Sequence, residues 1–67
     1  MPFLHVTLLE GRTPEKKEQL IAALTKTVHD VIDAPVESIR VCLQEVPAAH
    51  WGIAGQSVEQ RRAQKGE

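Results

Sequence analysis

One long amphipathic pattern separates two short β-branched segments, and this order limits the folds open to the chain. Thr13-Pro14-Glu15 has the residues of a helix start: a capping hydroxyl, a first-turn proline and an acid that suits the helix dipole. Asp33-Ala34-Pro35 ends the pattern, because the residue before a proline is driven out of helical space. Between these signals the apolar residues recur at three- and four-residue steps: Leu20, Ile21, Leu24, Val28, Val31 and Ile32.

The segments on either side of this helix have the composition of strands. Residues 3–9, FLHVTLL, and roughly residues 38–46, SIRVCLQEV, are rich in β-branched and apolar side chains. Strand, helix and strand in this order predict a right-handed βαβ unit with parallel strands. After Pro47, the two glycines of the stretch HWGIAG, residues 50–55, indicate a tight turn or a small hairpin.

These elements predict an α/β (α+β) fold with a single β-α-β unit, parallel strands and a short C-terminal hairpin. The chain is long enough for one domain, which we assign to residues 1–67. Order is expected over about residues 2–58. The tail over residues 59–67, EQRRAQKGE, lacks apolar periodicity, and we expect it to be flexible.

The core of such a chain must be thin. Domains of about this size bury only about 60% of the surface that the unfolded chain exposes, and the only aromatic residues are Phe3 and Trp51. Small scaffolds usually rely on disulfides, metals or oligomerisation. A lone Cys42, which we expect to be buried, excludes an intrachain disulfide, and no Cys/His spacing suits zinc. Because two parallel strands also leave open sheet edges, we expect a homo-oligomer.

Charge and hydropathy exclude several classes of partner. The net charge is −1, so there is no overall positive field to attract nucleic acid or anionic lipid. No stretch has the length of a membrane span or the pattern of a signal peptide. Together with a free thiol, these features predict a cytoplasmic protein without a nucleic-acid or membrane partner.

Pro2 stands at the head of the first predicted strand. The simpler interpretation is structural, because proline is tolerated at the first position of a strand. The chemical interpretation requires removal of Met1, which we expect, since it turns the Pro2 nitrogen from an amide into a secondary amine. Apolar surroundings and nearby cations both lower the pKa of an amine, which suits a general base near neutral pH.

Three further residues have a structural and a functional interpretation. Arg12 is either a solvated loop arginine or, with the helix N-terminus, a receptor for a carboxylate. Arg40 either faces outward on an alternating strand or binds an anion in the same way. Trp51 is either a core or interface anchor or the dry wall of a pocket.

Several motifs in this order resemble one known family. Pro2, the stretches LLEGRTPEKKEQLI and DAPVESIRV, and the HWGIAG turn are similar to the 4-oxalocrotonate tautomerases, the small-subunit branch of the tautomerase superfamily. The similarity covers about residues 2–58. No single motif is specific to this family, but the order and separations of the motifs are specific when taken together.

The resemblance implies a role for each matching residue. Methionine is removed in that family, and the proline corresponding to Pro2 is the general base that moves a proton along a conjugated enol acid. Arg12 would bind the distal carboxylate of the substrate, and Arg40, contributed by a neighbouring subunit, would hold the proximal carboxylate and oxygen. Trp51 replaces the phenylalanine of the best-known members and would keep the site dry. We add Leu9, at the end of the first strand, to the substrate-binding candidates.

The resemblance also implies an assembly and a reaction. Members of this branch form hexamers built as trimers of dimers, and each dimer shares a four-stranded sheet under two helices. No metal or organic cofactor is used. The implied reaction converts 2-hydroxymuconate, or a related 2-hydroxydienoate carboxylate, into its 2-oxo form in the catabolism of aromatic compounds.

Alternatives within and beyond this family stay open. A dehalogenase or hydratase of 3-haloacrylates is less favoured, because related enzymes place a glutamate where this chain has Gly52 and Ile53. The Trp51 change permits a tautomerase recruited to a biosynthetic pathway. A non-catalytic oligomeric binding domain is the alternative of a different class, and an intact mass that still includes Met1 would favour it.

Overall fold

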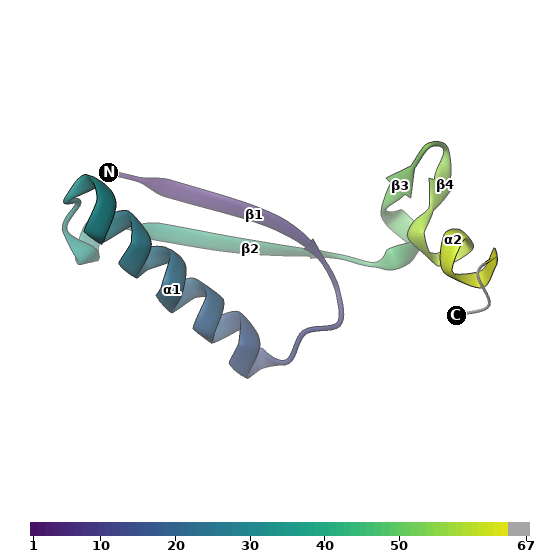
Figure 1. Cartoon of the computed structure of the whole chain (residues 1–67), viewed down its shortest axis with the longest axis horizontal. Helices are drawn as coiled ribbons and strands as arrows, with labels where there is room; N and C mark the ends of the chain where they lie inside the picture. The colour runs from purple at the N-terminus through teal and green to yellow at the C-terminus, as the bar shows by residue number, and fades with distance from the viewer. Residues whose placement is uncertain (65–67) are drawn as a thin grey trace.

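The computed structural model describes residues 1–64, and the chain folds as a β-α-β unit followed by a small C-terminal arm (Figure 1). The elements in chain order are β1 (Phe3–Leu9), α1 (Pro14–Ile32), the 3₁₀ turn η1 (Val36–Ser38), β2 (Arg40–Val46), the 3₁₀ turn η2 (Ala48–His50), β3 (Gly52–Ile53), β4 (Gln56–Ser57) and α2 (Val58–Gln64). β1 and β2 are parallel, and β3 and β4 form an antiparallel hairpin. The fold class predicted from the sequence is therefore confirmed.

The ends of α1 follow the predicted signals. The Thr13 hydroxyl accepts a hydrogen bond from the Lys16 backbone N–H at 3.2 Å, which satisfies one of the free donors of the first turn. At the other end, Asp33 adopts a left-handed conformation with φ of 60°, and its N–H donates to the His29 carbonyl. None of the helices among residues 1–64 has both the length and the apolar character needed to cross a membrane.

The register of β1 against β2 determines which residues of the two strands lie opposite each other. It runs from Phe3 opposite Arg40 to Leu9 opposite Val46. β2 begins at Arg40, two residues later than predicted, because residues 36–38 form the turn η1. In Figure 1, α1 lies along one side of this two-stranded sheet.

The two faces of the sheet differ in exposure. Side chains on the α1 side are half-buried: Leu4, Val6, Leu8, Val41 and Leu43. On the opposite side, which we call the open face, most are exposed: Phe3, His5, Thr7, Arg40, Cys42 and Gln44. The prediction that Cys42 is buried is therefore wrong for the single chain. The alternation of β2 was predicted correctly, but no element of the described chain covers the face on which Cys42 lies.

The C-terminal arm contains more regular structure than expected. Ala54 and Gly55 both have positive φ, at 53° and 85°, as the tight turns of two-residue hairpins require. Beyond the hairpin, α2 includes residues 59–64 of the segment expected to be flexible. Residues 65–67 lie outside the described residues.

A capping box explains the start of α2. The Ser57 hydroxyl accepts from the Gln60 N–H at 3.1 Å, and the Gln60 side-chain oxygen accepts from the Ser57 N–H at 2.9 Å. This reciprocal pair satisfies two backbone donors at the first turn. Val58, 9% exposed, donates its N–H to the Trp51 carbonyl at 2.8 Å. This bond joins the start of α2 to the residue that precedes β3.

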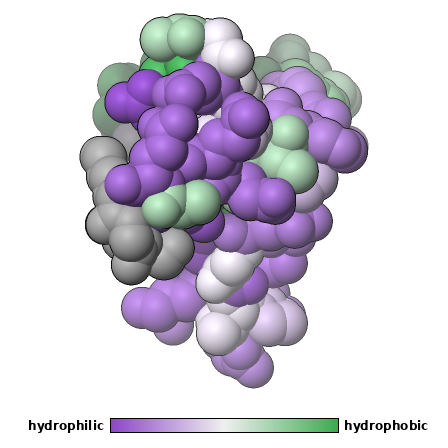
Figure 2. Space-filling model, turned by 90° about the vertical axis from the view of Figure 1, so that its right-hand side faces the viewer, coloured by the Kyte–Doolittle hydropathy of each residue, from purple (hydrophilic) through white to green (hydrophobic). Residues whose placement is uncertain are grey.

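The single chain has almost no core. Ile39 and Val58, at 8% and 9% exposure, are the buried hydrophobic residues. The radius of gyration is 15.6 Å, whereas a compact chain of this length has one of about 11 Å. Figure 2, which views the hairpin end, shows a mostly hydrophilic surface. Most of the large exposed apolar residues belong to the other end: Met1, Phe3, Val31, Ile32 and Val36.

Candidate active site

Pro2 and Arg40 lie together at the amino-terminal end of the sheet. The Arg40 backbone N–H donates to the Pro2 carbonyl at 3.1 Å, which extends the ladder by one residue beyond Phe3. The Arg40 side chain is exposed on the open face, and its Nη1 donates to the Glu37 carbonyl at 2.6 Å. Pro2 itself is half-buried. Pro2 and Arg40 are therefore joined through backbone atoms, while the Arg40 guanidinium is held at the Glu37 carbonyl.

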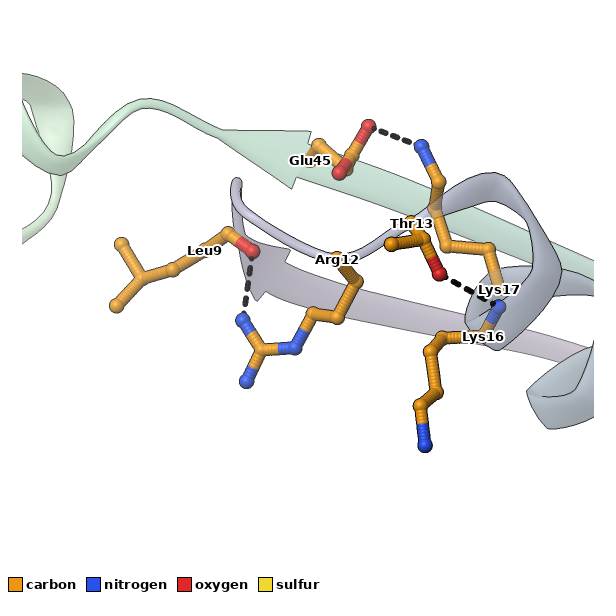
Figure 3. A network of polar contacts seen from close by, with 6 residues as sticks. All are labelled: Leu9, Arg12, Thr13, Lys16, Lys17 and Glu45. Carbon is orange, nitrogen blue, oxygen red and sulfur yellow. Dashed lines mark hydrogen bonds and ion pairs between the residues drawn. The ribbon is translucent and has the colours of Figure 1, made fainter.

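Arg12 and Leu9 lie at the opposite end of β1, in the turn that leads to α1. Arg12 is exposed, and its Nη1 donates to the Leu9 carbonyl at 2.9 Å (Figure 3). This bond uses one nitrogen of the guanidinium fork and leaves other N–H groups of the fork for an acidic ligand. Gly11, with φ of +129°, gives the turn a conformation that side-chain-bearing residues rarely adopt.

The two ends are too far apart to form one site within a chain. From Phe3 to Leu9, β1 has seven residues and spans about 20 Å at the usual rise per residue. A six-carbon diacid is shorter than about 10 Å at about 1.5 Å per bond. The structure therefore brings Pro2 together with Arg40, and Arg12 together with Leu9, but it does not bring all of them together.

Trp51 borders a shallow hollow at the same end of the sheet as Arg12. The hollow has a volume of about 310 Å³ and is lined by Thr7, Val46, His50, Trp51 and Gly52. Trp51 is half-buried. Trp51 and Val46 have apolar side chains, whereas His50 and Thr7 have side chains that can form hydrogen bonds. Such a lining suits a flat, unsaturated group with a polar substituent.

Sequence reasoning missed part of this lining. Neither His50 nor Thr7 is among the site residues predicted from the sequence. The alternation of β1 placed Thr7 on the same face as Leu9, and His50 directly precedes Trp51, so both signals were present. Among residues 1–64, no three His, Cys, Asp or Glu side chains lie close enough to hold a metal ion.

The resolved pKa shifts of the described groups lie away from both ends of the sheet. On the surface of α1, the hydrogen bond from Lys26 holds the pKa of the Asp30 carboxyl below its usual value. The same bond raises the pKa of the Lys26 ammonium. The pair is exposed, with side chains 78% and 49% accessible, so solvent screens it strongly.

Comparison with known proteins identifies the family of the chain. Residues 2–61 match the family of tautomerase enzymes. A probable tautomerase of Ralstonia nicotianae is 58% identical over 55 residues, covering 82% of this chain and 79% of the relative. The 2-hydroxymuconate tautomerase of Stutzerimonas stutzeri is 41% identical over 59 residues, covering 88% of this chain and 94% of the relative.

Solved structures show the same fold. TomN, a 4-oxalocrotonate tautomerase homologue in the tomaymycin biosynthetic pathway, superposes with a TM-score of 0.90 at 45% identity, over 92% of this chain and 95% of TomN. A heterohexameric 4-oxalocrotonate tautomerase from Chloroflexus aurantiacus superposes with a TM-score of 0.85 at 38% identity, over 90% of this chain and 97% of its own.

The chain therefore belongs to the tautomerase family, within its 4-oxalocrotonate tautomerase group. The resemblance predicted from the motifs is confirmed, and the protein is an enzyme of the isomerase class.

Proposed function

We propose that the protein, after loss of Met1, uses the amine of Pro2 as a general base to convert 2-hydroxymuconate, or a related 2-hydroxydienoate, into its 2-oxo form. The nitrogen takes the proton of the 2-hydroxyl group and returns it to a carbon of the conjugated chain, so no redox partner is needed. Arg40 holds the carboxylate and oxygen beside the hydroxyl. Arg12 holds the distal carboxylate and stabilises the charge that develops there.

The observation that carries this proposal is the separation of Pro2 and Arg12 along β1. The outer edge of β1 has no partner strand among residues 1–64. If two chains pair there antiparallel about a two-fold axis, each Pro2 comes to the end of its partner's β1, where Leu9 and Arg12 lie. One such pairing produces two equal sites and a four-stranded sheet under two helices.

Further assembly accounts for the surface that a dimer leaves exposed. Arg40 lies on the open face, from which it can enter the site of a neighbouring subunit stacked there. The exposed apolar residues and the near absence of a core favour a larger homo-oligomer. A solved relative from Chloroflexus aurantiacus is a heterohexamer, and we propose a hexamer of three dimers here, acting in the cytoplasm in the catabolism of aromatic compounds.

The deciding experiment is an ultraviolet assay with protein whose N-terminus has been verified by intact mass. We expect ketonisation of a 2-hydroxydienoate dicarboxylate, and loss of most of that activity in Pro2→Ala, because a primary amine changes both basicity and placement. Titration of the processed amine by NMR provides the independent check. A terminus that stays fully protonated up to about pH 8 would contradict the proposed base.

A second candidate is tautomerisation in a biosynthetic pathway. It is favoured by the similarity to TomN, which comes from the tomaymycin pathway, and by an indole beside the hollow where the best-known members have a phenyl ring. The same assay distinguishes the two candidates. A substrate range that extends to dienoates carrying a ring, at efficiency above that for 2-hydroxymuconate, would favour the biosynthetic role.

A further inference from the structure

An ion pair joins the start of α1 to the end of β2. Lys17 Nζ lies 2.9 Å from Glu45 Oε1, and the two side chains are only 29% and 30% exposed. Lys17 begins the helical stripe that continues with Leu20, Leu24 and Val28, all of them half-buried. The pair therefore lies at the end of the helix–sheet contact rather than on the outer surface of the helix (Figure 3).

The ion pair is one of two attachments that hold the turn carrying Arg12. At the beginning of this turn, the Glu10 N–H donates to the Val46 carbonyl at 3.0 Å. At its far side, Lys17 binds Glu45. Two consecutive residues of β2 thus hold both sides of the turn.

The connection from Lys17 back to Arg12 is short. The Lys17 N–H donates to the carbonyl of Thr13 at 3.1 Å, and Thr13 directly follows Arg12. Arg12 in turn donates to the Leu9 carbonyl. Between the two attachments lies Gly11, whose φ of +129° leaves the turn without the restraint that a β-carbon would give.

We infer that Lys17 and Glu45 are positioning residues for Arg12, and that their ion pair sets the affinity of the enzyme for the distal carboxylate of a diacid. This inference rests on the proposed function. Neither side chain touches the substrate. The pair acts by fixing the distance between the first turn of α1 and the end of β2, and so the place from which the guanidinium reaches a neighbouring subunit's substrate.

Positioning and simple charge effects predict different results for the single variants. Lys17→Met removes a positive charge near the anion site, and Glu45→Gln removes a negative one. If only the local field mattered, the first change would raise KM for a dianion and the second would lower it. If the pair positions Arg12, both changes raise KM, because either one detaches α1 from β2.

The experiment compares these variants on two substrates. With a 2-hydroxydienoate dicarboxylate, we expect KM to rise about fivefold in both Lys17→Met and Glu45→Gln with kcat changed less than about twofold, as for loss of a partly exposed ion pair. With a 2-hydroxydienoate that lacks the distal carboxylate, KM stays unchanged. The charge exchange Lys17→Glu/Glu45→Lys recovers at least half of the lost affinity.

A matched control comes from the other ion pair of α1. Lys26→Met breaks a Lys–Asp pair on the exposed side of the same helix and leaves KM for both substrates as in the wild type. Amide hydrogen exchange at Glu10, whose N–H is bound to the Val46 carbonyl, gives a readout that needs no substrate. Exchange there accelerates in both single variants and slows again in the charge exchange.

Three outcomes would overturn the inference. The first is opposite shifts of KM in the two single variants, which would assign the effect to the field. The second is an equal loss for both substrates, which would indicate general destabilisation. The third is unchanged KM with unchanged amide exchange. A wild-type enzyme that turns over no 2-hydroxydienoate would contradict both the proposed function and this inference. The three outcomes above would contradict the inference alone.

Discussion

Two inactive variants of this enzyme should restore each other's activity when they assemble together. Pro2→Ala removes the proposed base, and Arg12→Ala removes the receptor for the distal carboxylate. In one chain these residues lie at opposite ends of β1, about 20 Å apart, and the Arg12 guanidinium is bound to the Leu9 carbonyl at its own end. In the proposed function, a working site therefore combines Pro2 of one chain with Arg12 of another.

The expected recovery follows from random pairing. When the two variants are co-refolded in equal amounts, half of the dimers are mixed. In each mixed dimer, one site receives the intact Pro2 and the intact Arg12, while the other site receives neither. About one quarter of all sites are therefore of wild-type composition, and kcat/KM for the dicarboxylate returns to about 25% of the wild-type value.

The assay follows loss of the dienol absorbance at substrate concentrations well below KM, where loss of Arg12 has its full effect. Mixtures of either single variant with the double variant Pro2→Ala/Arg12→Ala are the controls, and they contain no complete site. Activity of the co-refolded mixture no greater than the average of the two separate variants would refute the shared site. Because the two residues lie too far apart to meet within one chain, this result would mean that Pro2 and Arg12 do not belong to the same site.

Three smaller perturbations test the local geometry. Gly11→Ala should lower the free energy of unfolding by about 2 kcal/mol, because φ at this position is strained for a residue with a β-carbon. Denaturant unfolding at fixed protein concentration measures this free energy. An unchanged unfolding midpoint would contradict the assigned conformation. Ser57→Ala should cost about 1 kcal/mol through loss of the cap of α2, and a change in protease cleavage confined to α2 checks it. The folded-state pKa of Asp30 is lowered by Lys26, so its contribution is present above the unfolded pKa and disappears as pH falls through the folded one. Asp30→Asn should therefore be less stable than the wild type at neutral pH and indistinguishable from it in strong acid, as pH-dependent unfolding would show.

Local sequence signals were sufficient for most elements of the fold. The capping residue Thr13, the first-turn proline and the Asp33-Ala34-Pro35 stop fixed both ends of α1, because each acts within a few residues. Alternation over residues 40–46 likewise identified the two sides of β2. The helix α2 was missed although its capping box, Ser57 to Gln60, was present in the sequence. The helix is short and lacks apolar periodicity, so its sequence gives no further signal. It is stabilised by Val58, which packs near η2 only in the folded chain.

The candidate site was predictable as a set of residues but not as an arrangement. Pro2, Arg12, Arg40 and Trp51 could each be singled out because their chemistry was unusual for their local position. The register of β1 against β2 places Arg40 beside Pro2, whereas in the proposed function Pro2 meets Arg12 only when two chains pair. No local signal encodes either arrangement. The ion pair between Lys17 and Glu45 joins residues far apart in sequence, and it became visible only when α1 was packed on the sheet.

The lack of a core and the division of the site have the same structural cause. Within residues 1–64, the βαβ unit covers a single face of its sheet and leaves the outer edges of β1 and β2 and the open face without partners. We therefore expect contacts with other chains to supply much of the free energy of folding. The candidate residues lie where those contacts form: Pro2 and Arg12 at the ends of the free β1 edge, and Arg40 on the open face. In the proposed function, assembly buries the apolar surface and completes the site in one step, and we expect a chain that fails to associate to lose its stability and its catalytic geometry together.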